Sequence, residues 1–528
     1  MNTLQTVPFL TCAESLAYEQ DLLGGDADAE WDAMKRAGDG LADELARDLR
    51  EWRNLPRKLR ILVLVGKGHN GGDALVATRR LLKFLPMGHA FVLPQVPFHD
   101  AKPNVRRAVA QLEKTDRATF LQPPDPKGEV AAITSVLLEA GGGQGFDLCL
   151  DGLLGMQFRP PLREPVRSLV EAINAFDKIG VRVAVDLPSG VGDESDEAPF
   201  QADFTYATGI AKAPLLDPVN ADAMGRLRYV DVGFFDEGQR PSAIRPEELL
   251  LANNVVMLRA LRPALCDKRT FGRVVILGGS RNMPGALLMA AKAAARSGVG
   301  LLTVCGPESA IPAFSAALPE AMWTALPETQ NGGLALEGRG QVLAALEGAS
   351  ALVAGPGLGS ERETQVLLTE ILGEFDGPVL LDADALRPEI LEALSRPDLA
   401  VLTPHAGELA RLAGGEAPVD ADALKSFCRE NGGVTLIVKG PLSRVCDADR
   451  ALVNDRGGPV LARGGSGDLL AGLAGGLLGG GRSPLEAAAL GVLWHGIAAD
   501  CLARQRGQEA VTITELLDHL AYALRNDV

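Results

Sequence analysis

The sequence predicts two α/β domains, each built around a mostly parallel β-sheet. Short apolar runs alternate with helical patterns through most of the chain, which is typical of successive strand–helix units. The chain has 528 residues, more than one hydrophobic core ordinarily serves. Many of its 60 glycines directly follow apolar runs, where α/β proteins place ligand-binding loops.

We place the first domain at residues 1–240 and the second at residues 250–528. The boundary, near residues 236–252, lacks clear periodicity and leads into a polar helical stretch. The expected elements of the first domain are strands at Arg60–Val65, Phe146–Leu150, Val181–Val185 and Asp203–Ala207, and a helix at Leu75–Phe84. Those of the second domain are strands at Arg273–Leu277, Leu301–Val304, Ala351–Ala354, Val379–Leu381, Ala400–Leu402 and Thr435–Val438, a helix at Gly285–Ser297 capped by Gly298, and a buried helix from Leu469 onward.

Composition and charge indicate which kinds of partner and which cellular compartment to expect. The formal net charge is −16, and an acidic surface argues against nucleic acid or an anionic membrane as the main partner. The N-terminus lacks a signal-peptide pattern, and the apolar stretch Leu469–Gly481 is too short to span a bilayer. Seven scattered cysteines without a CxxC pair suggest neither a disulfide framework nor a zinc site. We therefore expect a cytoplasmic protein.

A glycine-rich segment in the second half, Gly464–Asp468 (GGSGD), directly precedes an apolar helix. Its small residues let backbone N–H groups converge on an anion at the helix N-terminus. Asp468 beside such an anion could take a proton from a hydroxyl that attacks a phosphoryl group. Taken alone, the segment could equally be a turn with Asp468 as an ordinary N-cap.

Five further loops follow predicted strands of the second half. They are Gly278–Ser280 (GGS), Gly355–Gly359 (GPGLG), Asp382–Ala385 (DADA), Thr403–Glu408 (TPHAGE) and Lys439–Gly440 (KG). Ligands bind outside the carboxyl ends of parallel strands, so these loops should converge with Gly464–Asp468 at one edge of the sheet. The set predicts a nucleotide-dependent site and makes the N-cap interpretation of Asp468 the weaker one.

This ordered set of motifs, covering roughly residues 255–525, resembles the ribokinase-like NAD(P)H-hydrate dehydratase family. The resemblance implies a ribokinase-like αβα domain. It also implies an enzyme that uses ADP to phosphorylate the hydroxyl of hydrated NADH or NADPH and then eliminates phosphate to restore the ring, with magnesium. Carried over by motif, the substrate contacts are Ala286, Gly357, His405 and Asp468, the last as base. The nucleotide contacts are Lys439, Gly440, Pro441, Leu442, Ser443 and Gly467, although Pro441 removes one N–H donor from this loop.

In the first half, the loop Gly66–Asp73 (GKGHNGGD) follows a strand and leads into a helix. It fits neither the GxGxxG spacing nor a Walker A motif. Two later segments, Asp151–Gly155 and Asp186–Val191, place an aspartate where a strand should end. Asn70, Asp151 and Ser189 would supply only oxygen ligands, which suits a hard cation better than zinc.

These motifs, with Met34–Gly38, resemble the NAD(P)H-hydrate epimerase domain over roughly residues 5–235. The resemblance implies a Rossmann-like αβα sandwich that interconverts the R and S hydrates, with potassium held by Asn70, Asp151 and Ser189. The implied substrate contacts are His69, Asn70, Gly71, Gly72, Asp73, Gly155, Met156, Gln157, Phe158, Arg159, Pro160, Pro161 and Asp186. Asp186 is the candidate for proton handling.

The leading hypothesis is therefore a bifunctional repair enzyme with small-molecule substrates (the hydrates and ADP), which we expect to form a homo-oligomer. One alternative is a kinase of a vitamin precursor or sugar on the same ribokinase-like fold. Another makes the first half a non-catalytic binding module, because His69 and Ala74 replace an asparagine and a glycine that are usual in relatives.

Overall fold

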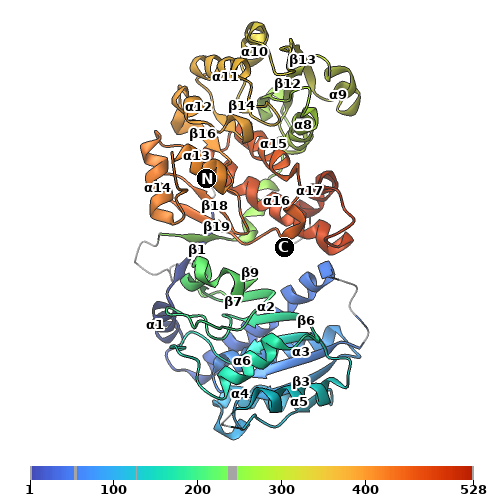
Figure 1. The fold of residues 1–528 in the computed structure, drawn as a ribbon, viewed down its shortest axis with the longest axis vertical. Helices are drawn as coiled ribbons and strands as arrows, with labels where there is room; N and C mark the ends of the chain where they lie inside the picture. Colours follow the sequence, from blue (N-terminus) through green and yellow to red (C-terminus); the bar gives the residue numbers. More distant parts are fainter. Residues whose placement is uncertain (1–2, 53–55, 57, 126–127, 236–245, 526–528) are drawn as a thin grey trace. The chain divides into compact units, whose positions relative to one another are not determined.

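The computed structural model describes residues 3–52, 56, 58–125, 128–235 and 246–525 (Figure 1). The chain divides into two compact units, one of Val7–Arg245 and one of Pro246–Val528 together with Met1–Thr6. Residues 236–245, in which most of the expected boundary falls, lie outside the described residues.

The N-terminal unit is built on a parallel sheet with the strand order β4-β3-β2-β5-β6-β7-β9 (Figure 1). These strands are β2 (Arg60–Val65), β3 (His89–Pro94), β4 (Ala118–Phe120), β5 (Phe146–Gly152), β6 (Ile179–Val185), β7 (Phe204–Thr208) and β9 (Arg226–Val230). Ile61 and Val63 of β2 join the core shared with helices α2 (Ala27–Trp52), α3 (His69–Phe84) and α4 (Pro103–Glu113). The alternate residues Leu62 and Leu64 pack with α5 (Val130–Gly141) and α6 (Val166–Ala175). This is the predicted αβα sandwich.

The C-terminal unit is also a sandwich, with the strand order β13-β12-β11-β14-β15-β16-β17-β18-β19-β10 (Figure 1). The strands are β10 (Glu248–Leu250), β11 (Arg273–Leu277), β12 (Leu301–Pro307), β13 (Met322–Leu326), β14 (Ala351–Ala354), β15 (Val379–Leu381), β16 (Ala400–Leu402), β17 (Thr435–Val438), β18 (Ser443–Cys446) and β19 (Ala451–Asn454). All neighbouring pairs are parallel except those that β18 makes with β17 and β19. The sheet is therefore mostly parallel, as predicted.

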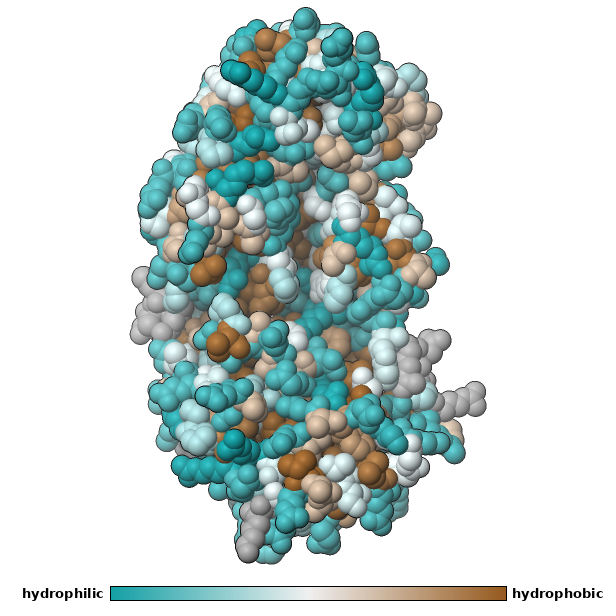
Figure 2. All heavy atoms as spheres, viewed as in Figure 1, coloured by the Kyte–Doolittle hydropathy of each residue, from teal (hydrophilic) through white to brown (hydrophobic). Residues whose placement is uncertain are grey.

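Helices cover both faces of this sheet. One face carries α8 (Pro284–Arg296), α15 (Ser466–Gly479), α16 (Pro484–Arg506) and α17 (Leu516–Arg525). The other carries α10 (Arg339–Leu346), α11 (Arg362–Glu374), α13 (Ala406–Leu412) and α14 (Ala421–Glu430). Among the helices that the structure describes, α16 alone is long and apolar enough to cross a bilayer, and 83% of its apolar window is buried inside the structure, as in a core helix. The side of the molecule seen in Figure 2 is mostly hydrophilic, with apolar side chains scattered in small groups.

The first residues of the chain belong to the C-terminal unit, which the sequence did not predict. Leu4 is buried in the core that contains Leu250 and Val255. The Gln5 backbone N–H donates to Asn254 Oδ1 at 2.7 Å, and its carbonyl accepts from the Leu251 N–H at 3.1 Å. From there the chain continues as β1 (Thr6–Leu10), which lies parallel to β8 (Ala211–Lys212) and leads into α1 (Cys12–Leu23).

The strand predictions hold better than the helix ends. Strands β2, β11, β14, β15, β16 and β17 have the predicted bounds, and β5, β6, β7 and β12 differ only at their ends. Helix α3 begins at His69, not Leu75, and α15 begins at Ser466, not Leu469. The C-cap of α8 is Ser297, with Gly298 in the left-handed region (φ +95°) just beyond it. The predicted polar helical stretch is wrong, because Glu248–Leu250 pairs with β19 as a strand.

The absence of a side chain at Gly472 lets α15 touch α8. A β-carbon at this position would overlap the backbone of Ala290 in α8, so the two helices are in backbone contact. We expect Gly472→Ala to destabilise the C-terminal unit by about 1–3 kcal/mol, because α15 must move away from α8. Thermal unfolding measures the effect. The control is Gly340→Ala in α10, where a β-carbon meets no atom within 4 Å, and its Tm should stay or rise. Equal Tm values for Gly472→Ala and the wild type would contradict this packing.

Candidate functional site

In the C-terminal unit, the loops that follow β11, β14 and β15 interlock at the carboxyl edge of the sheet. The Gly279 N–H donates to the Pro356 carbonyl at 2.8 Å. The Gly359 N–H donates to Asp384 Oδ2 at 2.8 Å. Gly355, at φ +127°, lies so close to the backbone of Asp382 that a β-carbon would overlap it. Three of the predicted loops are therefore one connected structure.

A lysine–carboxylate cluster joins the remaining loops to them. Lys439 Nζ lies 2.9 Å from Asp382 Oδ1 and 3.6 Å from Glu408 Oε2, and the Lys439 N–H donates to the Pro404 carbonyl at 2.8 Å. A β-carbon on Gly467 would lie 3.4 Å from Lys439 Nζ and 3.9 Å from Asp382 Oδ2, so the start of α15 faces this cluster. All six loops thus meet at one edge of the sheet, as their places after strands predict.

Asp468 lies in the first turn of α15 and does not cap it. The N-cap is Gly465, which takes the left-handed conformation at φ +94° and makes no side-chain capping bond. The N-cap interpretation of Asp468 is therefore wrong. The pKa of the Asp468 carboxyl is raised to about 6: burial raises it most, the neighbouring carboxylates of Asp382 and Asp384 add to the rise, and Lys439 opposes it. Such a carboxyl is ionised at neutral pH but basic enough to accept a proton.

Lys439 stays a cation in this setting. Burial lowers the pKa of its ammonium, but the negative charges of Asp382, Glu408 and Asp468 outweigh burial, and the net shift is upward. Its loop, Lys439–Ser443, is the turn between the antiparallel strands β17 and β18, and Gly440 and Pro441 are exposed there. A fixed positive charge beside an exposed turn suits a phosphate group.

The other predicted substrate contacts fall into two places. Gly357, at φ +67°, would bring a β-carbon within 3.0 Å of the Ala286 methyl group, so these two residues are neighbours. His405 is the N-cap of α13, where its Nδ1 accepts from the N–H groups of Gly407 (3.0 Å) and Glu408 (3.2 Å). Because Nδ1 is an acceptor, Nε2 carries the proton of the neutral ring, and the side chain is 60% exposed. His405 therefore has a structural role, and its Nε2 lies 3.4 Å from Glu408 Oε1.

In the N-terminal unit, the three predicted cation ligands lie in one hydrogen-bonded cluster. Ser189 donates from Oγ and from its N–H to the two oxygens of Asp151, each at 2.7 Å. Leu154 connects them to Asn70: its N–H donates to Ser189 Oγ at 3.0 Å and its carbonyl accepts from Asn70 Nδ2 at 2.6 Å. Burial raises the pKa of Asp151 to about 6, although the bonds from Ser189 and Leu153 lower it.

One oxygen in this cluster is unsatisfied. Asn70 Oδ1 is buried and has no hydrogen-bond partner among the residues that the structure describes, which is unusual for a buried amide oxygen. Together with the buried Asp151 carboxylate, it is an oxygen donor set of the kind that a hard cation uses. Gly155 adjoins it, since a β-carbon there would lie 3.5 Å from Asn70 Cβ.

Asp186, after β6, is held in a strained conformation by a buried lysine. Its φ is +68°, which is rare for a residue other than glycine. Thr208 donates to Asp186 Oδ1 from its N–H (3.1 Å) and Oγ1 (3.3 Å), and the buried Lys212 Nζ pairs with the same oxygen. Lys212 also donates to the Thr208 carbonyl at 3.0 Å. No residue that the structure describes donates to Oδ2.

The remaining predicted residues of this unit differ in burial and in charge environment. Burial raises the pKa of Asp73 well above its usual value, and the charges of Asp186 and Glu19 add to the effect. Burial also lowers the pKa of His69, whose Nε2 lies 3.1 Å from Lys102 Nζ. Phe158 is buried in the core, and its N–H donates to the Gly155 carbonyl at 3.0 Å. The rest of that predicted loop is Met156, Gln157, Arg159, Pro160 and Pro161, of which Gln157, Arg159 and Pro161 are exposed.

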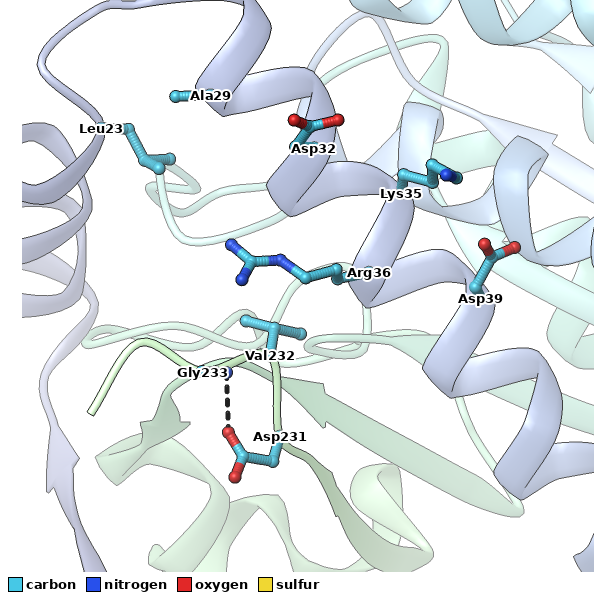
Figure 3. Close-up of a pocket in the computed structure, with 9 residues that line it drawn as sticks. All are labelled: Leu23, Ala29, Asp32, Lys35, Arg36, Asp39, Asp231, Val232 and Gly233. Atoms are coloured by element: carbon cyan, nitrogen blue, oxygen red, sulfur yellow. Dashed lines mark hydrogen bonds between the residues drawn. The ribbon is translucent and has the colours of Figure 1, made fainter. Parts of the chain in front are cut away.

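Helix α2 supports the glycine-rich start of α3. A β-carbon on Gly72 would lie 2.5 Å from Met34 Sδ, so the glycine permits the two helices to touch. Further along α2, Lys35 and Arg36 line a hollow with Asp39 and Asp231 (Figure 3). The other residues of this hollow are Leu23, Ala29, Asp32, Val232 and Gly233. None of the predicted substrate residues lines it, and we assign no chemistry to it.

Sequence reasoning missed four charged residues of these two sites. Asp382 and Glu408 lie in motifs that were recognised, but neither had an assigned role. Glu19 and Lys212 lie in segments without a motif, and their proximity to Asp186 arises only in the fold.

Comparison with known proteins agrees with both halves of the chain. Residues 274–521 match the family model described as NAD(P)H-hydrate dehydratase, and residues 31–213 match the model described as YjeF-related protein N-terminus. The bifunctional NAD(P)H-hydrate repair enzyme Nnr of Moorella thermoacetica is 33% identical, over 88% of this chain and 88% of its own length. That of Gloeobacter violaceus is 35% identical over 91% of each.

A solved ADP/ATP-dependent NAD(P)H-hydrate dehydratase from Bacillus subtilis, co-crystallised with ATP and Mg²⁺, is also similar. It is 27% identical and covers 52% of this chain and 96% of its own, with a TM-score of 0.43. The sequence identity and the coverage of the two Nnr relatives decide the assignment: the chain belongs to the family of bifunctional NAD(P)H-hydrate repair enzymes.

Proposed function

We propose that the two units act in turn on hydrated NADH and NADPH. The N-terminal unit interconverts the R and S hydrates. The C-terminal unit dehydrates the S form to NAD(P)H with ADP as co-substrate, giving AMP and phosphate. The observation that carries this proposal is that each unit gathers its own motif set at the carboxyl edge of its sheet, with a buried lysine–aspartate pair in each.

In the C-terminal unit, Asp468 is the base. It accepts the proton of the hydrate's hydroxyl as that oxygen attacks the terminal phosphoryl group of ADP. The backbone N–H groups at the start of α15 and the Lys439 ammonium stabilise the charge on the phosphoryl group. Loss of phosphate from the carbon that carried the hydroxyl, together with loss of a proton from the neighbouring carbon, then restores the ring double bond. Ala286, Gly357 and His405 bind the hydrate, and the turn Lys439–Ser443 with Gly467 binds the nucleotide.

Two cations belong to this proposal. Magnesium would neutralise phosphate charge in the C-terminal site, where the carboxylates of Asp382 and Glu408 offer the oxygen ligands it prefers. Potassium would be held in the N-terminal unit by Asn70, Asp151 and Ser189, and the unsatisfied Asn70 Oδ1 supports this. We also propose a reducing, cytoplasmic location, since the seven cysteines are free thiols.

Recovery of absorbance at 340 nm tests both activities at once. With a mixture of R and S NADH hydrates, Mg²⁺, K⁺ and ADP, we expect both epimers to be recovered faster than spontaneous epimerisation permits. Recovery of the S form alone would make the N-terminal unit a non-catalytic binding module. No recovery with either ADP or ATP would point to a small-molecule kinase.

The dehydratase should lose rate as the pH falls. The Asp468 carboxylate must be ionised to act as a base, so activity on the S hydrate should decline as the pH drops through about 6. Asp468→Asn should lower kcat by about 10²–10⁴-fold, the usual contribution of a general base. Asp449→Asn, on the exposed turn after β18, removes the same charge and should leave kcat unchanged. A carboxyl of this kind titrates within roughly pH 5–8. A dehydratase rate that stays constant over that range would therefore contradict the assigned role.

Removal of the unsatisfied oxygen tests the potassium site. Asn70→Ala should raise the K⁺ concentration needed for half-maximal epimerisation by about tenfold or more, because loss of one ligand costs roughly 1.4 kcal/mol or more of binding. A titration of epimerase rate with KCl at constant ionic strength measures this, with dehydratase activity as the internal control. An unchanged half-maximal concentration would rule out Asn70 as a ligand.

A further inference from the structure

The imidazole of His69, the first residue of α3, is contacted at one of its two nitrogens. Lys102 Nζ lies 3.1 Å from Nε2, which is within hydrogen-bond distance. Glu30 Oε2 lies 3.7 Å from the same nitrogen, which is too far for a hydrogen bond. Among the residues that the structure describes, none bonds to Nδ1, and the side chain is 38% exposed. Lys102 is therefore the partner of Nε2, and Nδ1 is open to a ligand.

The backbone holds Lys102 beside the glycine-rich loop that carries His69. The Lys102 N–H donates to the Lys67 carbonyl at 3.0 Å. Lys102 is also the N-cap of α4, and Pro103 follows it as the first residue of that helix. No carboxylate in the described part of the chain lies within ion-pair distance of the Lys102 ammonium, so no acidic side chain draws it away from the imidazole.

This contact fixes the tautomer of His69. A lysine ammonium has three donors and no acceptor, so Nε2 must be the acceptor. A ring nitrogen that accepts a hydrogen bond carries no proton, and the proton of the neutral imidazole then lies on Nδ1. A doubly protonated ring would instead place two donors and two positive charges 3.1 Å apart, which is incompatible with the contact.

The Nδ1–H group can take the place of an amide donor. The asparagine that is usual in relatives at this position has N–H donors in every state, whereas a neutral histidine has a donor at Nδ1 in only one of its two tautomers. Lys102 selects that tautomer. The nearby ammonium also favours an anionic acceptor, and the anionic oxygens of a hydrated dinucleotide are those of its phosphate groups.

We propose that Lys102 is a positioning residue of the epimerase site. It fixes His69 as the Nδ1–H tautomer, and this group donates a hydrogen bond to a phosphate oxygen of the hydrate. Lys102 lies outside the substrate contacts that the sequence predicts, and it acts through His69. This inference rests on the epimerase activity proposed for this unit and names a residue on which its substrate binding depends.

The first test is a double-mutant cycle in the full chain, read from the conversion of pure R hydrate to the S form. Lys102→Met should raise KM for the R hydrate by about tenfold, as expected for loss of one hydrogen bond to a charged group, with little change in kcat. In the His69→Asn background, Lys102→Met should leave KM unchanged, because an amide needs no partner to present its donor.

The cycle separates this role from a direct one. An equal rise in KM in both backgrounds would show that Lys102 binds substrate by itself, and it would overturn the inference. A wild-type KM for Lys102→Met would also overturn it. Lys114→Met is the matched control: Lys114 is exposed at the other end of α4, so the same loss of charge should not change KM. Dehydration of the S hydrate should be unchanged in every variant, which shows that each one folds.

Ring-nitrogen chemical shifts measured by NMR test the tautomer independently of activity. The chain has six histidines, and the signals of His69 are those lost in His69→Asn. The wild type should show a protonated Nδ1 and an unprotonated Nε2, and Lys102→Met should change this pattern. A proton on Nε2 in the wild type overturns the inference even if the epimerase is active. The expected tautomer in a wild type that does not speed equilibration of the hydrates overturns the proposed epimerase activity, and with it the role of His69 in binding the hydrate.

Discussion

Both sites depend on the burial of carboxylates. Each unit places an aspartate directly after a parallel strand, Asp186 after β6 and Asp382 after β15, and pairs it with a lysine. A buried carboxylate alone would be strongly disfavoured, so a lysine beside the aspartate is stabilising. A second carboxyl near this pair then has its pKa raised by burial: Asp468 in one unit and Glu19 in the other. Two unrelated motif sets thus arrive at the same electrostatic arrangement.

Parallel strands create this constraint and also satisfy it. Their carboxyl ends gather loops that are far apart in sequence, and the helices that follow turn their N-termini toward the same edge. In the C-terminal unit, the close approach of these loops depends on residues without side chains, such as Gly355 against Asp382. The glycine content noted in the sequence is therefore a requirement of loops that touch through their backbones.

The central strands could be predicted from sequence because they are buried on both faces and read as unbroken apolar runs. Strand β13 could not, since its residues are mostly half-exposed or exposed, and β10 is only a short piece beside β19. The starts of α3 and α15 were misplaced because glycines argue against helix locally. In α3, the close approach of Met34 nevertheless requires a glycine at position 72. Within the sites, the motif residues could be predicted because they occur together, as a set of loops that follow strands. Lys212 and Glu19 were not, because burial and neighbouring charge are properties of the fold and not of local sequence.

The segment Leu4–Thr6 gives the order of synthesis a structural consequence. These residues precede the whole N-terminal sheet in the sequence, whereas the partners that bury Leu4 and hydrogen-bond Gln5, among them Leu250, Leu251 and Asn254, follow it. During translation, at rates on the order of 5–20 residues per second, the segment is therefore made well before its partners. A gene split between the two units would separate this segment from its partners, so the C-terminal unit would be made without one of its own segments.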